Sequence, residues 1–457
     1  MNRCSVLVLA AGQGTRMRSQ LPKVLHELAG RPLLWHILQA VRGLQPDHLT
    51  VVTGYQADLV EQTLAAPDIH WVRQNERKGT GHAVLCAMPD LASQTGELLI
   101  LNGDHPLVQT STLQALLDHH RQQAHLLTLL STTLDDPYGY GRVVRDQEDR
   151  LLRIVEEKDA DASIRAIKEV NTGFYCVALD RLPEWLSRID NHNAQNEYYL
   201  PDIVSMAMAE GGAAVMRVDD ALSLSGVNDR IQLARLEAVF RERMILRCMA
   251  EGVTFVDPGS CWVAADVRIG ADTVIEPNVL LGPGSVVGER CHIGPFCHIQ
   301  ASRIGPGCQI HSFCHLDGVD IEGDSGIGPY ARLRPGTWLE PKARVGNFCE
   351  VKKSRIGANT KINHLSYIGD AVVGRDVNIG AGTITCNYDG VNKHQTVIED
   401  HVFVGSDVQL VAPVRVGSGA TIGAGTTVTK DVPAAALAVS RTPQTHVSTW
   451  LRKKAKS

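Results

Sequence analysis

A glycine-rich segment near the start of the chain has the composition of a phosphate-binding loop. The apolar run 6–9 leads into Ala10-Ala11-Gly12-Gln13-Gly14-Thr15-Arg16-Met17, a pattern typical of a buried parallel strand that opens into such a loop. The segment matches neither a Walker motif nor G-x-G-x-x-G. Arg16 and Lys23 supply two cations where a triphosphate would need them. The sequence therefore predicts that phosphates bind beside this loop.

Asp104 follows another apolar run, 98–101, and so lies at the carboxyl end of an expected strand. Open α/β sheets bind their ligands at this edge. A carboxylate placed there is a natural Mg²⁺ ligand in phosphoryl chemistry. The alternative is that Asp104 only caps a turn, and His105 is expected to be no more than a neighbour.

These residues need a sheet to position them. Apolar runs at 6–9, 49–53, 69–72 and 98–101 are separated by longer segments, which predicts strands alternating with helices. The first half of the chain is therefore expected to be a Rossmann-like α/β domain.

The second half of the chain is a six-residue repeat. Aliphatic residues recur at every sixth position, with occasional five-residue steps: Ile269, Ile275, Leu281, Val287, Ile293 and Ile299; Ile304, Ile310 and Leu316; Ile321 through Val351; Ile356, Ile362 and Ile368; Val373 and Ile379; and Ile398 through Val428. This period is the signature of a parallel β-helix, in which three such units form one triangular coil. The aliphatic side chains are expected to stack inward as ladders.

A second inward position lies two residues before each aliphatic one and is nearly always small. Five cysteines occupy it: Cys291, Cys297, Cys308, Cys314 and Cys349. We interpret them as small buried core residues rather than metal ligands or disulfides. The total of 11 cysteines is odd and includes no C-x-x-C pair, which also argues against a disulfide framework.

The clearest break in the repeat is the segment 386–395, which is rich in turn-forming residues. It is predicted to project from the coils as a lid. His364 follows the inward Ile362 by two positions and is therefore expected at a corner, near Lys352 and Tyr367. A lone histidine is more often structural, so its neighbours decide the interpretation.

Several motifs occur in the order typical of sugar-1-phosphate nucleotidyltransferases. They are Leu9-Ala10-Ala11-Gly12-x-Gly14-Thr15-Arg16-Met17, Pro22-Lys23, Gln74 with Gly79-Thr80-Gly81, and Gly103-Asp104. Gly139-Tyr140-Gly141-Arg142, Val155-Glu156, Asn171-Thr172-Gly173 and Gly226-Val227-Asn228 extend the match. Essentially the whole chain resembles the bacterial bifunctional N-acetylglucosamine-1-phosphate uridylyltransferase/glucosamine-1-phosphate N-acetyltransferase family. Asn102 departs from the pattern, because related enzymes carry an aromatic residue there.

The resemblance implies uridylyl transfer from UTP in the first half of the chain. It assigns Arg16 and Lys23 to the phosphates, and Mg²⁺ to Asp104 and Asn228. The residues that it implies for UTP and UDP-N-acetylglucosamine binding are Leu9, Ala10, Ala11, Gly12, Lys23, Gln74, Gly79, Thr80, Asn102, Gly103, Asp104, Gly141, Glu156, Asn171 and Asn228. The product would feed peptidoglycan and lipopolysaccharide biosynthesis.

For the second half, the resemblance implies acetyl transfer from acetyl-CoA to glucosamine-1-phosphate, with His364 as the proton acceptor. An imidazole with a pKa of about 6.5 suits this role. The implied sugar-phosphate residues are Arg334, Lys352, Tyr367 and Asn378, and the implied acetyl-CoA residues are Ala381, Asn387, Tyr388, Ser406, Ala424 and Arg441. The β-helix is expected to be left-handed and to associate as a homotrimer with these sites between subunits.

Charge and composition exclude other classes of function. A formal net charge of −5, with acids and bases mixed along the chain, gives no footprint for nucleic acid or an anionic membrane. The short apolar stretch 6–11 predicts neither a signal peptide nor a membrane span, so a cytoplasmic location is expected. The basic run 452–456 is expected to be a solvated tail.

The expected organisation is a uridylyltransferase domain at 1–228, a helical linker at 229–250, and an acetyltransferase β-helix with a C-terminal tail at 251–457. Two alternatives stay open. The β-helix could be a structural or regulatory module on a monofunctional nucleotidyltransferase, or the whole chain could be a non-enzymatic scaffold.

Overall fold

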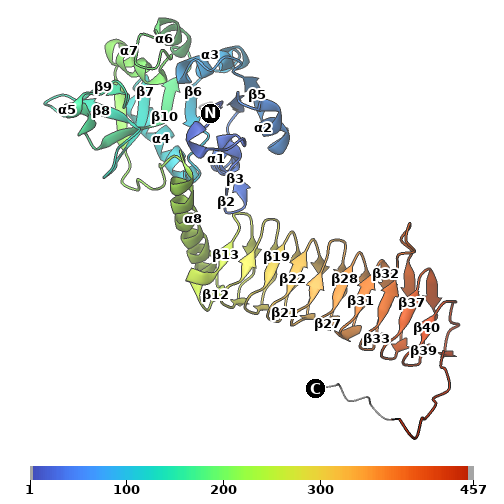
Figure 1. The fold of residues 1–457 in the computed structure, drawn as a ribbon. Helices are drawn as coiled ribbons and strands as arrows, with labels where there is room; N and C mark the ends of the chain where they lie inside the picture. Colours follow the sequence, from blue (N-terminus) through green and yellow to red (C-terminus); the bar gives the residue numbers. More distant parts are fainter. Residues whose placement is uncertain (1–3, 451–457) are drawn as a thin grey trace, which may run out of the picture. The chain divides into compact units, whose positions relative to one another are not determined.

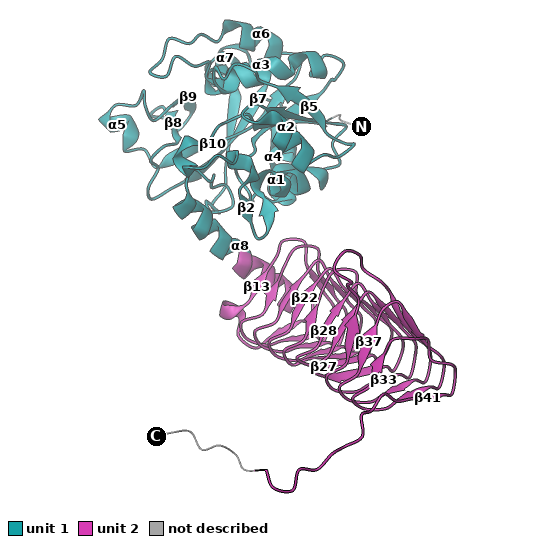
Figure 2. Cartoon of the chain, turned by 45° about the vertical axis from the view of Figure 1, so that its right-hand side comes forward, with its two compact units in different colours: residues 1–240 teal, residues 241–457 magenta. Residues whose placement is uncertain are grey.

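The computed structural model describes residues 4–450 and divides into two compact units, 1–240 and 241–457, which Figure 2 distinguishes by colour. Helix α8 (Arg230–Ala250) occupies the segment expected to be a helical connector, and the division falls inside it. The domain limits 1–228, 229–250 and 251–457 remain predictions. The basic run 452–456 lies outside the described residues.

A mixed nine-stranded sheet forms the centre of the N-terminal unit (Figure 1). Its main path runs β11-β7-β10-β6-β1-β4-β5, and β8 and β9 extend it from β10. The strands are β1 (Cys4–Ala10), β4 (His48–Thr53), β5 (His70–Arg73), β6 (Glu97–Asn102), β7 (Leu127–Thr133), β8 (Gly141–Arg145), β9 (Leu151–Val155), β10 (Glu169–Ala178) and β11 (Ala213–Arg217). Strands β1, β4, β5 and β6 are mutually parallel and lie where the sequence predicts strands. Strand β10 runs antiparallel to β6 and β7, which the sequence did not predict.

Helices cover both faces of this sheet. They are α1 (Leu33–Arg42), α2 (Ala57–Thr63), α3 (Thr80–Leu91), α4 (Thr110–Gln123), α5 (Ala162–Arg165), α6 (Leu182–Arg188) and α7 (Ile203–Glu210). Along β1 the side chains alternate, so Val6 and Val8 pack in one core with residues of α1 and α4, whereas Leu7 packs in another with α3, α6 and α7. Because the side chains along the strands pack into these two cores, the residues at the strand ends are the ones available to form a binding site.

The C-terminal unit is a left-handed parallel β-helix of hexapeptide repeats. Each strand pairs in parallel with the strand three places further along the chain, except that β39 (Thr421–Ile422) pairs with β41, and this pairing builds sheets of 11, 10 and 9 strands. The first sheet runs from β12 (Thr254–Phe255) to β41 (Leu437–Ala438), the second from β13 (Trp262–Val263) to β40 (Thr427–Val428), and the third from β14 (Arg268–Ile269) to β38 (Val414–Val416). No helix in the described part of the chain is long and apolar enough to cross a bilayer.

The interior of the β-helix confirms both inward positions of the repeat. The repeating aliphatic residues are buried, and so are the five cysteines at the small position, all of which are free thiols. Hydroxyl groups at this position bond to the next coil, as when Thr273 Oγ1 donates to the carbonyl of Gly288 at 2.8 Å and Thr360 Oγ1 to that of Gly374 at 2.7 Å. These bonds satisfy buried hydroxyl groups at this position, whereas the hydroxyl of Thr396 is buried without a hydrogen-bond partner.

The predicted insertion forms a hairpin between β34 (Ile384–Cys386) and β35 (Thr396–Ile398). Tyr388 and Lys393 face each other across an antiparallel bridge. Asp389 Oδ1 accepts hydrogen bonds from the backbone N–H groups of Val391 and Asn392 at 2.8 and 2.6 Å. Figure 1 shows the hairpin standing out from the coils near β32 (Ala371–Val373).

Candidate active sites

Two glycines allow loops to close around the N-terminal site. Gly14 has a φ of +68°, and a Cβ there would lie 2.5 Å from the Cβ of Lys23. Gly79 has a φ of +104°, and a Cβ there would lie 2.6 Å from the carbonyl oxygen of Tyr198. After Gly14 the chain makes only a short 3-10 turn, Thr15–Met17. The expected phosphate loop therefore relies on side-chain cations rather than on a following α-helix.

A cavity of about 320 Å³ opens where β1, β5 and β6 end. It is lined by Leu9, Ala10, Ala11, Gly12, Lys23, Val24, Gln74, Arg77, Gly79, Thr80, Ala83, Asn102, Asp104 and Glu197. All the residues expected to contact uracil and ribose line it. Gly103 does not line the cavity. Its N–H donates to the carbonyl of Leu9 at 2.9 Å and so joins the end of β6 to β1.

The Lys23 ammonium lies between two oxygen groups in this cavity. It contacts the Asp104 carboxylate and is 3.0 Å from Oδ1 of Asn228, to which Arg16 Nη2 also donates at 3.0 Å. Oδ1 of Asp104 is buried and has no hydrogen-bond partner. Asp104 and Asn228 thus converge on a cation while one carboxylate oxygen remains unsatisfied. This donor set fits a hard divalent cation such as Mg²⁺.

Charged neighbours keep Asp104 ionised. Burial alone would raise its pKa, but the Lys23 ammonium and His105 outweigh burial, and the pKa lies below its usual value. His105 is buried, its Nδ1 is 2.9 Å from the carbonyl of Leu224, and its Nε2 is 3.3 Å from Asp104 Oδ1. Burial lowers the pKa of His105. His105 therefore lies against the Asp104 carboxylate.

A second cavity of about 180 Å³ adjoins the first and shares Leu9, Thr80, Asn102 and Asp104 with it. The expected sugar residues Gly141, Glu156 and Asn171 line it together with Asn228. Asn171 is held at both ends of its amide, since Nδ2 donates to the hydroxyl of Tyr175 at 2.6 Å and Oδ1 accepts from the N–H of Gly173 at 3.1 Å.

The carboxyl group of Glu156 is poised to be protonated near neutral pH. Burial and the nearby carboxylates of Asp159, Asp202 and Glu197 raise its pKa to about 7. Burial, with Asp190 and Asp159, likewise raises the pKa of Asp202 to about 6. A neutral carboxyl can donate a hydrogen bond, which suits a pocket for a hydroxylated sugar.

In the β-helix, His364 lies exposed at the end of β30 (Lys361–His364). It pairs in register with Asn347 on β27 (Arg344–Asn347), and its Nδ1 is 2.7 Å from Asn347 Oδ1. An amide oxygen can only accept a hydrogen bond, so Nδ1 is the nitrogen that carries the proton. Nε2 is then the basic nitrogen. Asn347 therefore fixes the orientation of the imidazole and leaves Nε2 free of this contact.

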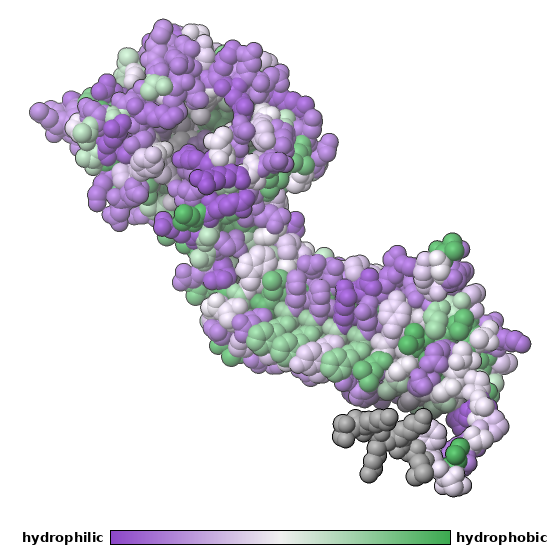
Figure 3. All heavy atoms as spheres, in the orientation of Figure 1, coloured by the Kyte–Doolittle hydropathy of each residue, from purple (hydrophilic) through white to green (hydrophobic). Residues whose placement is uncertain are grey.

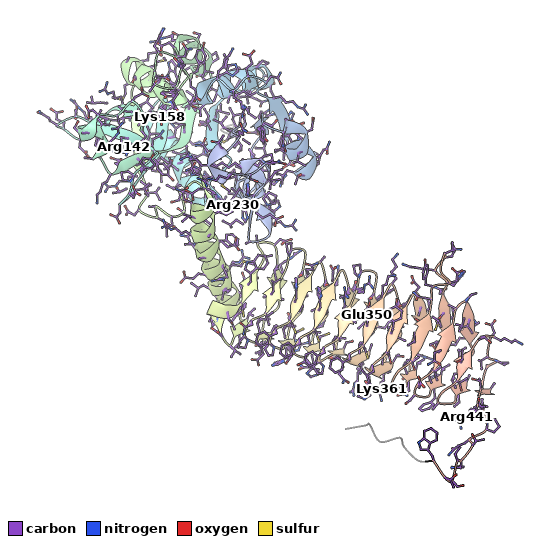
Figure 4. All side chains as sticks on the ribbon, viewed as in Figure 1. Arg142, Lys158, Arg230, Glu350, Lys361 and Arg441 are labelled. Atoms are coloured by element: carbon purple, nitrogen blue, oxygen red, sulfur yellow. The ribbon has the colours of Figure 1, made fainter. Side chains whose placement is uncertain are left out.

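The residues expected to bind acetyl-CoA continue from His364 along the same turn of successive coils. The registers Lys361↔Asn378, Asn378↔Phe403 and Phe403↔Thr421 place Ala381, Ser406 and Ala424 in one column with His364. Backbone bonds join the column, from Asp407 N–H to the Ala381 carbonyl at 2.7 Å and from Gly425 N–H to the Ser406 carbonyl at 2.8 Å. Figure 4 shows Arg441 beyond the last coils, and its Nη2 would lie 3.3 Å from a Cβ at Gly423, beside Ala424.

Basic residues meet at the base of the hairpin. Lys352 Nζ is 3.8 Å from Asp370 Oδ2, and Asn387 Nδ2 donates to the same carboxylate oxygen. Lys393 on the hairpin lies so close to Lys352 that this neighbour lowers the pKa of Lys393, and it also faces Tyr367. Two ammonium groups side by side favour binding of a phosphate.

Arg334, Asn378 and Tyr388, which are also expected in this site, make other contacts. Arg334 Nη1 donates to Glu350 Oε1 at 2.9 Å, on the strand labelled by Glu350 in Figure 4. Asn378 begins β33 (Asn378–Ile379) in the first sheet and lines a groove with Lys361, whereas Tyr367 begins β31 (Tyr367–Gly369) in the second. The side chain of Tyr388 is exposed, and its hydroxyl donates to the carbonyl of Gly390 at 2.5 Å.

Several residues of these sites escape sequence reasoning. Asn347 and Lys393 belong to the second site through a register between coils and through a hairpin fold, neither of which shows in the local sequence. Tyr175 acts through Asn171, four residues earlier on a strand that was not predicted. The one sequence signal that could have assigned Lys393 to the second site is its position within the turn-rich insertion 386–395.

Family models match both units. Residues 6–170 match the MobA-like NTP transferase domain, and residues 266–301 and 395–430 match the bacterial transferase hexapeptide (six repeats). These matches confirm the two expected transferase folds and disfavour a non-enzymatic scaffold.

Curated relatives match over almost the full length of the chain. "Bifunctional protein GlmU" of Trichlorobacter lovleyi is 48% identical over 452 residues, and that of Pseudomonas fluorescens is 50% identical over 448 residues. The protein of the same name from Pelobacter propionicus is 47% identical over 452 residues. In each case the alignment covers 98% of this chain and 98% of the relative.

Proposed function

Because the chain belongs to the family of bifunctional GlmU proteins, we propose that its two units perform two consecutive transfers that make UDP-N-acetylglucosamine. The chain is a transferase, with a nucleotidyltransferase fold followed by a hexapeptide acetyltransferase fold. In the proposed order, acetyl-CoA first acetylates glucosamine-1-phosphate in the β-helix. The N-acetylglucosamine-1-phosphate formed then reacts with UTP in the N-terminal unit.

Uridylyl transfer needs positioning and charge neutralisation rather than a covalent nucleophile. A phosphate oxygen of N-acetylglucosamine-1-phosphate attacks the α-phosphorus of UTP in line, and pyrophosphate leaves. Lys23 and Arg16 offset the negative charge that gathers on the phosphates. Glu156 and Asn171 hold the sugar, while Gln74 and the segment 9–12 hold uracil and ribose.

Asp104 and Asn228 are the residues that would hold Mg²⁺. The unsatisfied Oδ1 of Asp104 and the convergence of both side chains on the Lys23 ammonium support this assignment. The bound ion would neutralise phosphate charge. The proposed ligands of Mg²⁺ belong to the uridylyl-transfer site alone. Chelation of the ion is therefore expected to suppress uridylyl transfer far more than acetyl transfer.

Acetyl transfer requires an uncharged amine on the glucosamine. His364 Nε2 accepts a proton from the ammonium as the nitrogen attacks the thioester carbonyl, and CoA leaves as the thiol. Lys352, Arg334, Tyr367 and Asn378 would bind the sugar phosphate. Ala381, Ser406 and Ala424 would line the path of acetyl-CoA, with Asn387, Tyr388 and Arg441 at its sides.

The column that joins His364 to Ala381, Ser406 and Ala424 carries the bifunctional proposal. A β-helix that served only as a structural module would not need an oriented imidazole in register with this column. We further propose a cytoplasmic location, because the substrates are free metabolites. We also propose a homotrimer, because Asn378 lies on a different sheet from Tyr367 and a neighbouring subunit could bring such residues together.

The test is an assay of the purified protein with glucosamine-1-phosphate, acetyl-CoA, UTP and Mg²⁺ that follows free thiol and pyrophosphate separately. Both products are expected, and EDTA should suppress pyrophosphate far more than thiol. Asp104→Asn should lower pyrophosphate release by about 10²-fold or more and spare thiol release. Asp68→Asn, which alters an exposed aspartate paired with Arg42, is the matched control. Release of pyrophosphate only from added N-acetylglucosamine-1-phosphate, with no thiol, would make the β-helix a structural module.

A further inference from the structure

Two histidines and an aspartate gather at the edge of the N-terminal sheet opposite the nucleotide cavity. His48 begins β4 and His70 begins β5, whereas the cavity residue Gln74 follows the other end of β5. Asp90 lies in the last turn of α3, which packs on β4 and β5. Within residues 4–450 this is the one group of three or more His, Cys, Asp and Glu side chains whose ligand atoms all lie within 4.8 Å of one another.

The carboxylate of Asp90 serves both imidazoles. His48 Nε2 is 2.8 Å from Asp90 Oδ2, and His70 Nδ1 is 3.5 Å from Asp90 Oδ1. The centroids of the two rings are 4.1 Å apart. In a tetrahedral zinc site with bonds of about 2.1 Å, neighbouring ligand atoms lie about 3.4 Å apart. The two distances between imidazole nitrogen and carboxylate oxygen are thus near that spacing, and all three ligand atoms lie within 4.8 Å of one another before any ion is bound.

The surroundings prepare the group for an ion. Thr50 lies two residues after His48 on the same face of β4, and its hydroxyl donates to Asp90 Oδ2 at 2.7 Å. Such a bond fixes the orientation of a ligating carboxylate. The His48 side chain is 9% exposed, but those of Asp90 and His70 are 25% and 53% exposed, so an ion could enter from solvent.

We infer that His48, His70 and Asp90 form a binding site for one divalent transition-metal ion of the zinc class, with water as the remaining ligand. Two imidazoles and one carboxylate select Zn²⁺, Co²⁺ or Ni²⁺ rather than the Mg²⁺ preferred by oxygen ligands. The bound ion joins β5, the edge strand of the sheet, to β4 and α3. Because it binds only the folded arrangement, it stabilises the N-terminal unit.

The experiment titrates metal-free, full-length protein with Zn²⁺ in excess Mg²⁺, by calorimetry and by thermal unfolding. One Zn²⁺ per chain and a rise in Tm of a few degrees are expected. His70→Ala should weaken binding by at least about tenfold and remove the rise in Tm. Visible absorption of bound Co²⁺ should show tetrahedral geometry in the wild type and lose that signature in the variant.

The matched control is His192→Ala. His192 is an exposed histidine with its Nδ1 3.6 Å from Asp190, and among residues 4–450 it belongs to no group of three ligand side chains. This control should bind Zn²⁺ as the wild type does. His48→Gln gives a second test of the same site, and normal uridylyl transfer in each variant shows that it is folded. Zinc binding that is equal in wild type, His70→Ala and His48→Gln, or the absence of binding in all three, overturns the inference.

Discussion

At the scale of single residues, the acetyl transfer that we propose depends on the imidazole of His364. Asn347 accepts from Nδ1 of His364 and leaves Nε2 available as the base. Replacing His364 by alanine is expected to lower kcat for thiol release by about 10²-fold or more, because no other group would take the ammonium proton. Pyrophosphate release from UTP and N-acetylglucosamine-1-phosphate should stay near normal.

Two further variants separate this role from a general disturbance of the β-helix. His401→Ala removes another exposed β-helix histidine, whose Nδ1 is 3.8 Å from Asp376, and should leave both activities unchanged. Asn347→Ala should reduce acetyl transfer by about tenfold and shift its pH profile, since the imidazole loses its orientation. Loss of both activities in His364→Ala would reject the assignment.

Glu156 makes the stability of the N-terminal unit depend on pH. Its pKa is about 7 in the folded protein, against the ordinary value of 4.5 for a glutamate exposed to solvent. Between these two pH values the folded state holds a proton that the unfolded state has lost, so stability falls as pH rises. The full shift corresponds to at most about 3 kcal/mol. Thermal unfolding of the free enzyme should therefore occur at lower temperature at pH 7 than at pH 5.

The Glu156→Gln variant removes this titration and should flatten the pH dependence of Tm. In this variant Asp202, whose pKa is about 6, should still make Tm fall with rising pH, but with a smaller slope. Glu184→Gln, which changes an exposed glutamate, serves as the control and should keep the wild-type slope. A slope that is identical in Glu156→Gln and the wild type would assign the effect to other groups.

At the scale of elements, the hairpin 387–395 brings Lys393 to Lys352. The backbone N–H of His394 donates to the carbonyl of Asn387 at 2.8 Å and joins the two arms at their base. Residues 388–393, which include the bridge between Tyr388 and Lys393, can therefore be replaced by Gly-Gly. Acetyl transfer is expected to fall by at least about tenfold in kcat/KM, because a phosphate-facing cation is lost. Steady-state assays with varied glucosamine-1-phosphate measure the effect.

The shortened hairpin should unfold within a few degrees of the wild type and keep full uridylyl transfer, since it contributes little to the buried core. Lys393→Ala should reproduce most of the loss through KM. An unchanged KM in both variants would show that the hairpin does not reach the sugar phosphate.

The elements differ in how far the sequence could predict them. The β-helix followed directly from its period, because each six-residue unit repeats one strand and one corner and the buried positions repeat with it. Strands β1, β4, β5 and β6 were also found, since each contains a short apolar run, whereas the parallel pair β7 and β11 was not predicted. Strand β10 was missed because its apolar residues are interrupted by Asn171, Thr172 and Gly173, where the register shifts. That irregularity is where the sugar cavity forms.

The same distinction applies to the sites. Residues that follow a strand end, such as Asp104, could be placed from the strand alone. Asn347 could not, because its partner His364 is 17 residues away and only the coil register brings them together. The pairing of Lys23 with Asn228 joins positions 205 residues apart and depends on the whole unit.

At the scale of the whole molecule, the surface of the β-helix suits contact with other chains. Phe296, Phe313, Tyr330 and Phe348 stack in a ladder with ring centroids 5.0, 4.9 and 5.2 Å apart, and each is 45–56% exposed. Figure 3 shows apolar residues gathered in strips on the visible face of the β-helix, whereas the visible face of the N-terminal unit is largely hydrophilic. Contiguous exposed apolar surface favours association between chains.

Association is expected to matter for only one of the two activities. The two N-terminal cavities are lined by residues of a single unit, but Asn378 lies on a different sheet from Tyr367 and would complete the acetyl-transfer site of a neighbouring subunit. Sedimentation should give a mass of about 149 kDa, three times the 49.7 kDa of one chain. Dilution until this species dissociates should abolish acetyl transfer and preserve uridylyl transfer per chain. If dissociated chains retained both activities, each subunit would hold a complete acetyl-transfer site and Asn378 would have another role.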